Sequence, residues 1–194
     1  TFGHAQSLKG LLGNVATAAK NSVATSTGSN SIFDFLTGTK SLTMKNLVGT
    51  WTYSEPAAAF QSKNMLSQAG GVLVAKTIQA KAGSALSQYG IKPGAMKFTF
   101  KADSTFTCTV GKKTVKGTYG VSGTNVIFYK AGVKALAANA NMKSSNMQIT
   151  FKADKLLSLV KMLNYVPGNN ATLTAVSKLA STYNGMQVGM QFKK

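Results

Sequence analysis

The sequence predicts a mainly β protein with helical insertions, arranged as an eight-stranded up-and-down antiparallel barrel. Apolar residues make up 44% of the 194 positions, which is enough to fill a core. From about residue 95, apolar and polar residues alternate through six short segments separated by turn residues, as in half-buried antiparallel strands. Two further strands are expected near 48–54 and at 186–193. Pairing these two closes the sheet into a barrel and removes both of its free edges.

The six central strands fall between residues 95 and 152. Short turns such as Gly111-Lys112 and Ser122-Gly123 join consecutive strands, so a meander is expected. Lysine and threonine occupy the alternate positions, which we assign to the solvent-exposed outer face of the barrel. The apolar parity gives the predicted inward set: Met96, Phe98, Phe100, Phe106, Cys108, Tyr119, Met147, Ile149, Phe151, Met186, Met190 and Phe192.

Residues 1–41 are predicted to be an N-terminal helix and linker ahead of the barrel, which spans 42–194. The apolar residues of 5–24 form one helical stripe, and 25–31 is a small-polar linker. The apolar patch at 32–36 is expected to dock the helix on the main body, with a partner-binding segment as the alternative. A single helical turn capped by Thr43 then leads into the first strand.

Two helical insertions are expected, at about 56–90 after the first strand and 154–184 before the last. Pro56 suits the first helical position, and Gly70-Gly71 suggests a bent joint between two helical pieces. Asp154 is the predicted N-cap of the first helix in the second insertion. These helices either cover one mouth of the barrel or pack outside it.

The formal net charge is +18, from 22 lysines and four acidic residues, without any arginine. The absence of the planar, bidentate guanidinium makes nucleic acid an unlikely partner. The lysines are also dispersed along the chain, which is typical of a solvated face. An anionic membrane surface or lipopolysaccharide remains an alternative partner for such a basic protein.

The scarcity of chemically active side chains argues against an enzyme. The acidic residues, the one histidine and the one cysteine are Asp34, Glu55, Asp103, Asp154, His4 and Cys108. No cluster of metal ligands exists among them, and a catalytic triad would depend on His4 near the chain terminus. We therefore expect no catalytic residue, metal or cofactor. Cys108 is expected to be buried and inert.

No apolar run approaches the roughly 20 residues of a membrane-spanning helix. The chain begins at Thr1, so a processed or truncated N-terminus is expected.

Gly49-Thr50-Trp51 stands at the start of the first strand, behind a short helical turn, and is similar to the lipocalin signature. Five segments reinforce this likeness: 47–57 (LVGTWTYSEPA), 59–62 (AFQS), 98–106 (FTFKADSTF), 154–157 (DKLL) and 185–189 (GMQVG). Across roughly 43–194 the chain resembles a lipocalin-like (calycin-type) family of secreted or envelope proteins from Gram-negative gut bacteria. The resemblance implies a periplasmic, outer-membrane-anchored or secreted location, but no mechanism.

One departure from the lipocalin pattern concerns the basic residue that packs across the signature tryptophan, which is usually an arginine. Because this chain has none, we expect Lys193 or Lys194 to lie over Trp51 as a weaker cation–π partner.

The resemblance and the inward set together predict binding of a small hydrophobic or amphipathic ligand inside the barrel. An eight-stranded barrel either holds one such ligand or fills its interior with side chains, and both outcomes stay open. Alternatives are a basic surface-acting protein and an interaction module with a filled barrel. The candidate ligand-binding residues are Met96, Phe98, Phe100, Phe106, Cys108, Tyr119, Tyr129, Phe151 and Met190.

Overall fold

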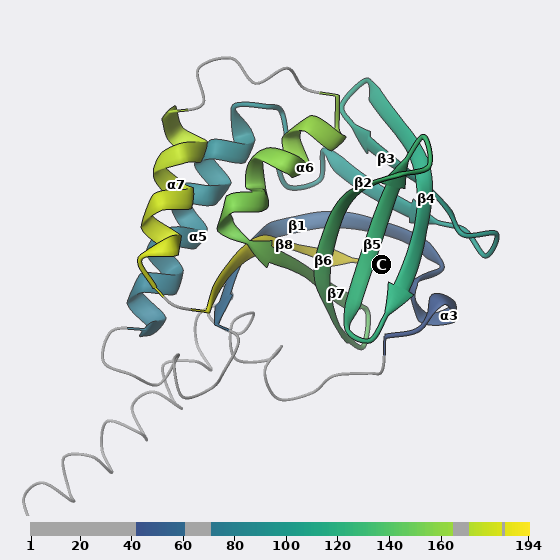
Figure 1. The fold of residues 1–194 in the computed structure, drawn as a ribbon, viewed down its shortest axis with the longest axis horizontal. Coiled ribbons are helices and arrows are strands. Elements are labelled where there is room, and N and C mark those ends of the chain that lie inside the picture. Colours follow the sequence, from purple (N-terminus) through teal and green to yellow (C-terminus); the bar gives the residue numbers. More distant parts are fainter. Residues whose placement is uncertain (1–41, 61–70, 165–170, 184) are drawn as a thin grey trace, which may run out of the picture.

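The computed structural model describes residues 42–60, 71–164, 171–183 and 185–194. Eight antiparallel strands follow one another around a closed barrel, and β8 returns to pair with β1 (Figure 1). This arrangement confirms the predicted up-and-down barrel and its closure through the first and last strands. The strands are β1 (Gly49–Phe60), β2 (Met96–Phe100), β3 (Thr105–Val110), β4 (Lys113–Ser122), β5 (Asn125–Lys130), β6 (Val133–Lys143), β7 (Asn146–Lys152) and β8 (Met186–Lys193).

The alternation read from the sequence determines which side chains point inward. In β2, for example, Met96, Phe98 and Phe100 are buried while Lys97 is exposed. All twelve residues of the predicted inward set belong to one continuous hydrophobic core. A shift of one residue in any strand would move its apolar side chains to the outer face, so this pattern fixes the register.

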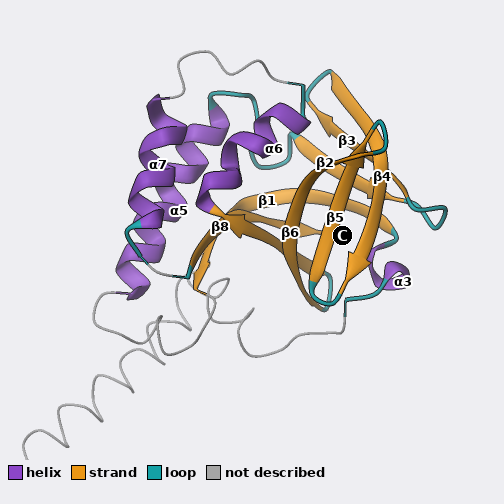
Figure 2. Ribbon diagram, in the orientation of Figure 1, coloured by secondary structure: helices purple, strands orange, loops and turns teal. Residues whose placement is uncertain are grey.

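The helices divide between the two ends of the barrel. They are α3 (Met44–Leu47), α5 (Gly71–Ser87), the 3-10 turn η1 (Ala153–Lys155), α6 (Leu156–Met162) and α7 (Ala171–Ser181). Figure 2 shows α5, α6 and α7 gathered beyond one end of the strands, whereas α3 lies at the other. None of the helices in the described ranges is long and apolar enough to cross a bilayer. The predicted N-terminal helix and linker (1–41) and Gly70 of the predicted bent joint lie outside the described residues.

The first strand is longer than predicted, and the expectation of a helix beginning at Pro56 is wrong. β1 continues to Phe60, and its second half pairs residue by residue with β8. Only Gly49–Thr52 of β1 pairs with β2, so the missing N–H of Pro56 faces no partner strand there. Instead α5 covers this edge: Gln79 Nε2 donates to the Pro56 carbonyl at 2.7 Å. Pairing with β8 therefore overrides the helical preference of the alanine run.

The predicted cap at Asp154 is also wrong. The chain turns directly from β7 into η1, so Asp154 lies within the turn and Lys155 is the N-cap residue of α6, without a side-chain capping bond. The Asp154 carboxylate lies 3.5 Å from the Lys155 ammonium instead. By contrast, the Thr43 hydroxyl accepts from the Asn46 amide at 3.2 Å, which confirms the predicted cap of α3.

The two-residue turn between β5 and β6 contains backbone strain that a substitution can relieve. Ala131 and Gly132 both have positive φ, of 51° and 77°, and a Cβ disfavours this region. Asparagine tolerates it better and is common at this position of a type I′ turn. We expect Ala131→Asn to raise the free energy of unfolding by about 0.5–1 kcal/mol in urea titrations. Ala137→Asn, at an exposed position in β6, should give no such gain.

Candidate functional site

The half of the barrel interior that lies toward α3 is packed with aromatic rings. The Phe98 ring is central: its centroid lies 5.5 Å from that of Phe128, 5.6 Å from those of Phe100 and Phe192, and 5.9 Å from that of Phe106. These are ordinary contact distances between rings. Neighbouring strands each contribute a ring, so the interior here is occupied by side chains.

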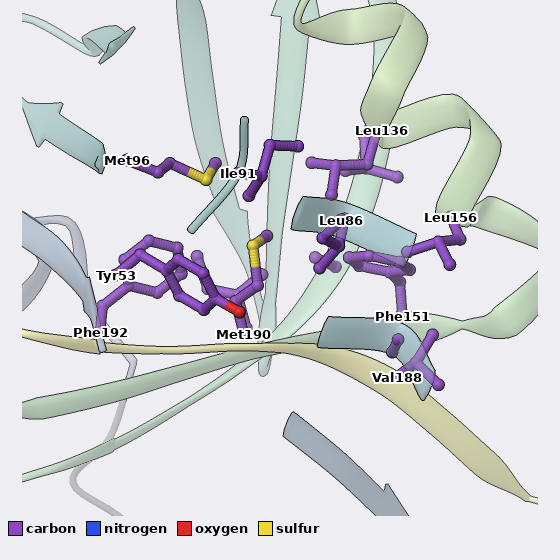
Figure 3. Packing of buried hydrophobic residues seen from close by; sticks show 14 of the residues in the cluster. Tyr53, Leu86, Ile91, Met96, Leu136, Phe151, Leu156, Val188, Met190 and Phe192 are labelled. Atoms are coloured by element: carbon purple, nitrogen blue, oxygen red, sulfur yellow. The ribbon is translucent and has the colours of Figure 1, made fainter. Parts of the chain in front are cut away.

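The other half of the interior is aliphatic and methionine-rich, and helices close it. Figure 3 shows Leu86 and Ile91, from α5 and the loop after it, beside Met190 of β8. Leu156, at the start of α6, lies close to Phe151 of β7 in the same view. The insertions therefore cover this mouth, which is one of the two placements expected for them.

Eight of the nine predicted ligand-binding residues lie inside the barrel. Tyr129 does not: it alternates with the inward Phe128, and its ring lies beside Gly120 on the outer wall. The Tyr119 hydroxyl already donates to the Lys101 carbonyl at 2.9 Å. Burial raises the pKa of the Cys108 thiol well above its usual range, which keeps it protonated and unreactive. Among the polar candidates, Tyr129 therefore lies outside the barrel, the Tyr119 hydroxyl is hydrogen-bonded, and the Cys108 thiol is buried.

The α3 end of the barrel is sealed around the signature tryptophan. Trp51 Nε1 donates to the Leu47 carbonyl at 2.7 Å. Lys194 Nζ lies 5.1 Å from the centroid of the Trp51 ring and donates to the Val48 carbonyl at 2.8 Å. Gly49 has a φ of 132°, which favours glycine, and Lys194 crosses close beside it. Of the two expected lysines, Lys194 is therefore the cation–π partner.

Removing this lysine tests its structural role. We expect Lys194→Ala to lower the free energy of unfolding by about 0.5–1 kcal/mol, the usual contribution of an exposed cation–π contact. Urea unfolding followed by the fluorescence of Trp51, the single tryptophan, measures this change. Lys193→Ala is the matched control and should have less effect. An equal loss in both variants would argue against the specific contact.

A groove lies on the outside of the helix-covered end, between the β5–β6 turn and α6. We call it the basic groove; its volume is about 400 Å³. It is lined by Lys130, Ala131, Val133, Lys134, Ala135, Ser158, Lys161 and Met162. Four of the lining residues are apolar, and one of them, Val133, is 69% exposed.

Comparison with known families fits this architecture. A family model described as lipocalin-like domain (DUF4923) matches residues 20–194. The chain belongs to this lipocalin-like family. Among solved structures, it is similar to a crystal structure of a DUF4847 family protein from Bacteroides vulgatus, with 13% identity and a TM-score of 0.33 over 76% of this chain and 92% of that chain. No curated protein matches the chain.

In this lipocalin-like protein the basic groove combines cationic and apolar groups. Lys130 comes from β5, Lys134 from β6 and Lys161 from the last turn of α6. Lys130 Nζ donates to Asn164 Oδ1 just beyond α6, which ties the hairpin to the helix. None of the described carboxylates lines the groove. Three lysines beside four apolar residues suit a ligand with an anionic head and an apolar tail.

The sequence analysis missed this groove because its residues show no motif. Lys134 and Lys161 are 27 positions apart and belong to a strand and a helix. Their approach depends on how α6 packs against β6, which the sequence pattern does not encode. The nearest signal was the Ala131-Gly132 turn, which places lysine-bearing strand ends side by side.

The described carboxylates occupy separate environments, and no group of metal ligands occurs in the described ranges. Hydrogen bonds from the Thr105 hydroxyl and amide lower the pKa of Asp103, which therefore serves the β2–β3 turn. Burial raises the pKa of Glu55 on β1, while the charge of Lys193 opposes that shift. Asp154 pairs with Lys155.

Proposed function

We propose that this lipocalin-like protein is a non-enzymatic binding protein that holds a single-chain amphipathic anion in the basic groove. The observation that carries the proposal is a groove lined by three lysines and four apolar residues, without a lining carboxylate. A volume of about 400 Å³ falls in the range of small-molecule sites. The head group would meet the lysines, and the tail would cover Val133, Ala135 and Met162.

The barrel interior is the second place where a ligand might be sought, as the lipocalin resemblance implies. The packed rings around Phe98 favour a filled barrel, and the helices and Lys194 cover its two ends. A ligand would have to displace these side chains to enter. The groove needs no such rearrangement, so the geometry supports it better.

Isothermal titration calorimetry with decanoate tests the proposal. We expect saturable 1:1 binding to the wild-type protein, and weaker binding of decan-1-ol, which has the same tail without the charge. The variant Lys134→Ala/Lys161→Ala should bind decanoate about tenfold more weakly, because each exposed ion pair contributes about 0.2–1 kcal/mol. Binding should also weaken between about 0.05 and 0.5 M salt, since salt screens exposed charges.

The charge-matched control is Lys97→Ala/Lys116→Ala, which removes two exposed lysines from the outer wall away from the groove. This variant should bind decanoate like the wild type. Undiminished binding by the groove variant would place the ligand elsewhere, with the interior as the next candidate. Equal losses of decanoate affinity in the two double variants would show that binding depends on net charge alone. Either result would overturn the proposal.

The envelope or secreted location implied by the family resemblance stays a prediction. A single-chain anion in the basic groove is compatible with it, because such amphiphiles are released from membranes.

A further inference from the structure

The outer wall of the barrel carries a regular array of threonine and lysine side chains across β1, β2, β3 and β4. They alternate with inward residues such as Trp51, Phe98 and Phe106, so they point to the outside. The strand register places four of them side by side in a first row: Thr50, Thr99, Thr107 and Lys116. The second row, two residues away along each strand, consists of Thr52, Lys97, Thr109 and Thr114. We call these eight residues the threonine face.

The threonine face is open to solvent, and its composition is particular to this side of the barrel. Each of its residues is exposed or half-buried. On β5 and β6, by contrast, the outward residues that stand opposite each other include Ile127 and Ala137. Figure 1 shows β2, β3 and β4 on the side of the barrel away from α5 and α7. A partner can therefore reach the threonine face without any rearrangement of these helices.

Hydrogen bonds between neighbouring strands hold hydroxyl groups of this face in place. The hydroxyl oxygens of Thr50 and Thr99 are 3.0 Å apart, and those of Thr109 and Thr114 are 3.2 Å apart. A hydroxyl donates one hydrogen bond and accepts two, so each pair keeps one donor and further acceptor positions for a ligand. The face therefore presents hydroxyl groups that are already ordered before a ligand binds, which lowers the entropic cost of binding.

The charge of the threonine face favours an anionic and hydrophilic partner. Lys97 and Lys116 supply one ammonium group to each row, and no position of the face is acidic. Asp103, in the turn after β2, already accepts from the amide and the hydroxyl of Thr105. None of the large apolar side chains that are exposed in the described residues belongs to the face. A bilayer surface is therefore a poorer fit, because interfacial binding depends on buried apolar area as well as on charge.

We propose that the threonine face binds an acidic polysaccharide, a polymer that combines many hydroxyl groups with repeated carboxylates. The threonine hydroxyls exchange hydrogen bonds with sugar hydroxyls, and Lys97 and Lys116 pair with the carboxylates. Three strand spacings separate β1 from β4, so each row is about 14 Å long. Small-molecule sites are concave, whereas this wall is extended and shallow. An elongated polymer suits such a wall because it gains affinity from several weak contacts made together.

Calorimetric titration of the full chain with an alginate oligosaccharide, in which every sugar carries a carboxylate, tests the proposal. We expect saturable binding to the wild type and about tenfold weaker binding to Thr99→Val/Thr107→Val, because each lost hydrogen bond weakens binding several-fold. Valine keeps the shape, the charge and the strand preference of these positions. The matched control is Thr77→Val/Thr174→Val, at exposed positions on α5 and α7, and it should bind like the wild type. Undiminished binding by the variant of the face would overturn the proposal.

A second pair of variants separates the threonine face from the overall charge of the protein. Lys97→Ala/Lys116→Ala should bind the alginate oligosaccharide about tenfold more weakly than the wild type. Lys81→Ala/Lys178→Ala removes the same charge from exposed positions on α5 and α7 and should bind it like the wild type. Equal losses in the two variants would mean that net charge alone attracts the polymer, which would contradict a specific face.

The choice of polymer tests the chemistry of the partner. Dextran has hydroxyl groups without charge, and a single-stranded oligonucleotide has charge without hydroxyl-rich rings, so both should bind at least tenfold more weakly than the alginate oligosaccharide. Equal binding of the oligonucleotide would make the partner any polyanion, and equal binding of dextran would remove the role of the lysines. Either result would refute an acidic polysaccharide. The substituted residues lie outside the basic groove, so these outcomes are independent of decanoate binding.

Discussion

Replacing Phe98 by alanine is expected to lower the free energy of unfolding by about 3–5 kcal/mol. Its ring contacts the rings of four other phenylalanines from β2, β3, β5 and β8, so truncation opens a cavity at the centre of the aromatic half of the barrel. Protein interiors are close-packed, and the surrounding strands can collapse only partly into such a space. Urea unfolding followed by Trp51 fluorescence and by circular dichroism measures the loss.

The control for this prediction is Lys97→Ala, at the neighbouring position on the outer face of β2. It should change the free energy of unfolding by less than about 0.5 kcal/mol, as exposed substitutions usually do. A Phe98→Ala loss as small as that of Lys97→Ala would mean that the interior is loosely packed. That result would favour an interior ligand site over a filled barrel.

Replacing Gly189 by alanine is expected to cost about 3 kcal/mol or to prevent folding, although only one methyl group is added. The new Cβ would lie 1.8 Å from the Ile149 carbonyl oxygen and 2.7 Å from the Thr150 Cα, which are backbone atoms of the paired strand. Relief therefore requires β7 and β8 to separate along their paired length. Thermal unfolding by circular dichroism measures the effect.

Gly120→Ala is the matched substitution in β4. A Cβ there would meet only the Tyr129 Cε2 atom at 4.0 Å, an ordinary contact distance. We expect this variant to unfold within about 0.5 kcal/mol of the wild type. Similar stabilities for the two variants would show that the β7–β8 approach is wider than described.

The proposals treat the barrel interior as filled with side chains and place the binding function on the outer surface. Lysines such as Lys97 and Lys116 face solvent on the outer barrel wall. The basic groove differs because Lys134 and Lys161 there line the same groove as four apolar residues. A net charge of +18 is therefore informative only where the fold concentrates it.

Several elements could be predicted from local sequence because local physics decides them. Strict alternation, as in Met96-Lys97-Phe98, leaves one way to bury the apolar face, so the strands of the meander and their parity followed directly. The Thr43 cap involves residues three positions apart and was also readable. Pro56 and Asp154 misled the prediction because the signal at each was local, whereas pairing with β8 and the direct entry into η1 determined the outcome.

The candidate site was less accessible from sequence. Tyr129 was assigned to the interior, but it alternates with the inward Phe128, so its ring lies outside. The choice of Lys194 over Lys193 depends on where β8 ends relative to Trp51. Lys130 and Lys161 carry no shared pattern at all. The place of Tyr129 follows from strand alternation, whereas the other two facts depend on how separate elements meet.

The sequence by itself determined a closed eight-stranded barrel, the inward set of side chains and the small number of side chains suited to catalysis. These follow from period-two patterning, from the need to remove sheet edges and from composition. Only the tertiary structure decided that the interior is packed around Phe98, that three lysines converge beside α6, and that Gln148 and Gln191 are buried on the outer wall. Packing and convergence arise between residues far apart in the chain, and their distances are set by the assembled fold and not by local preference.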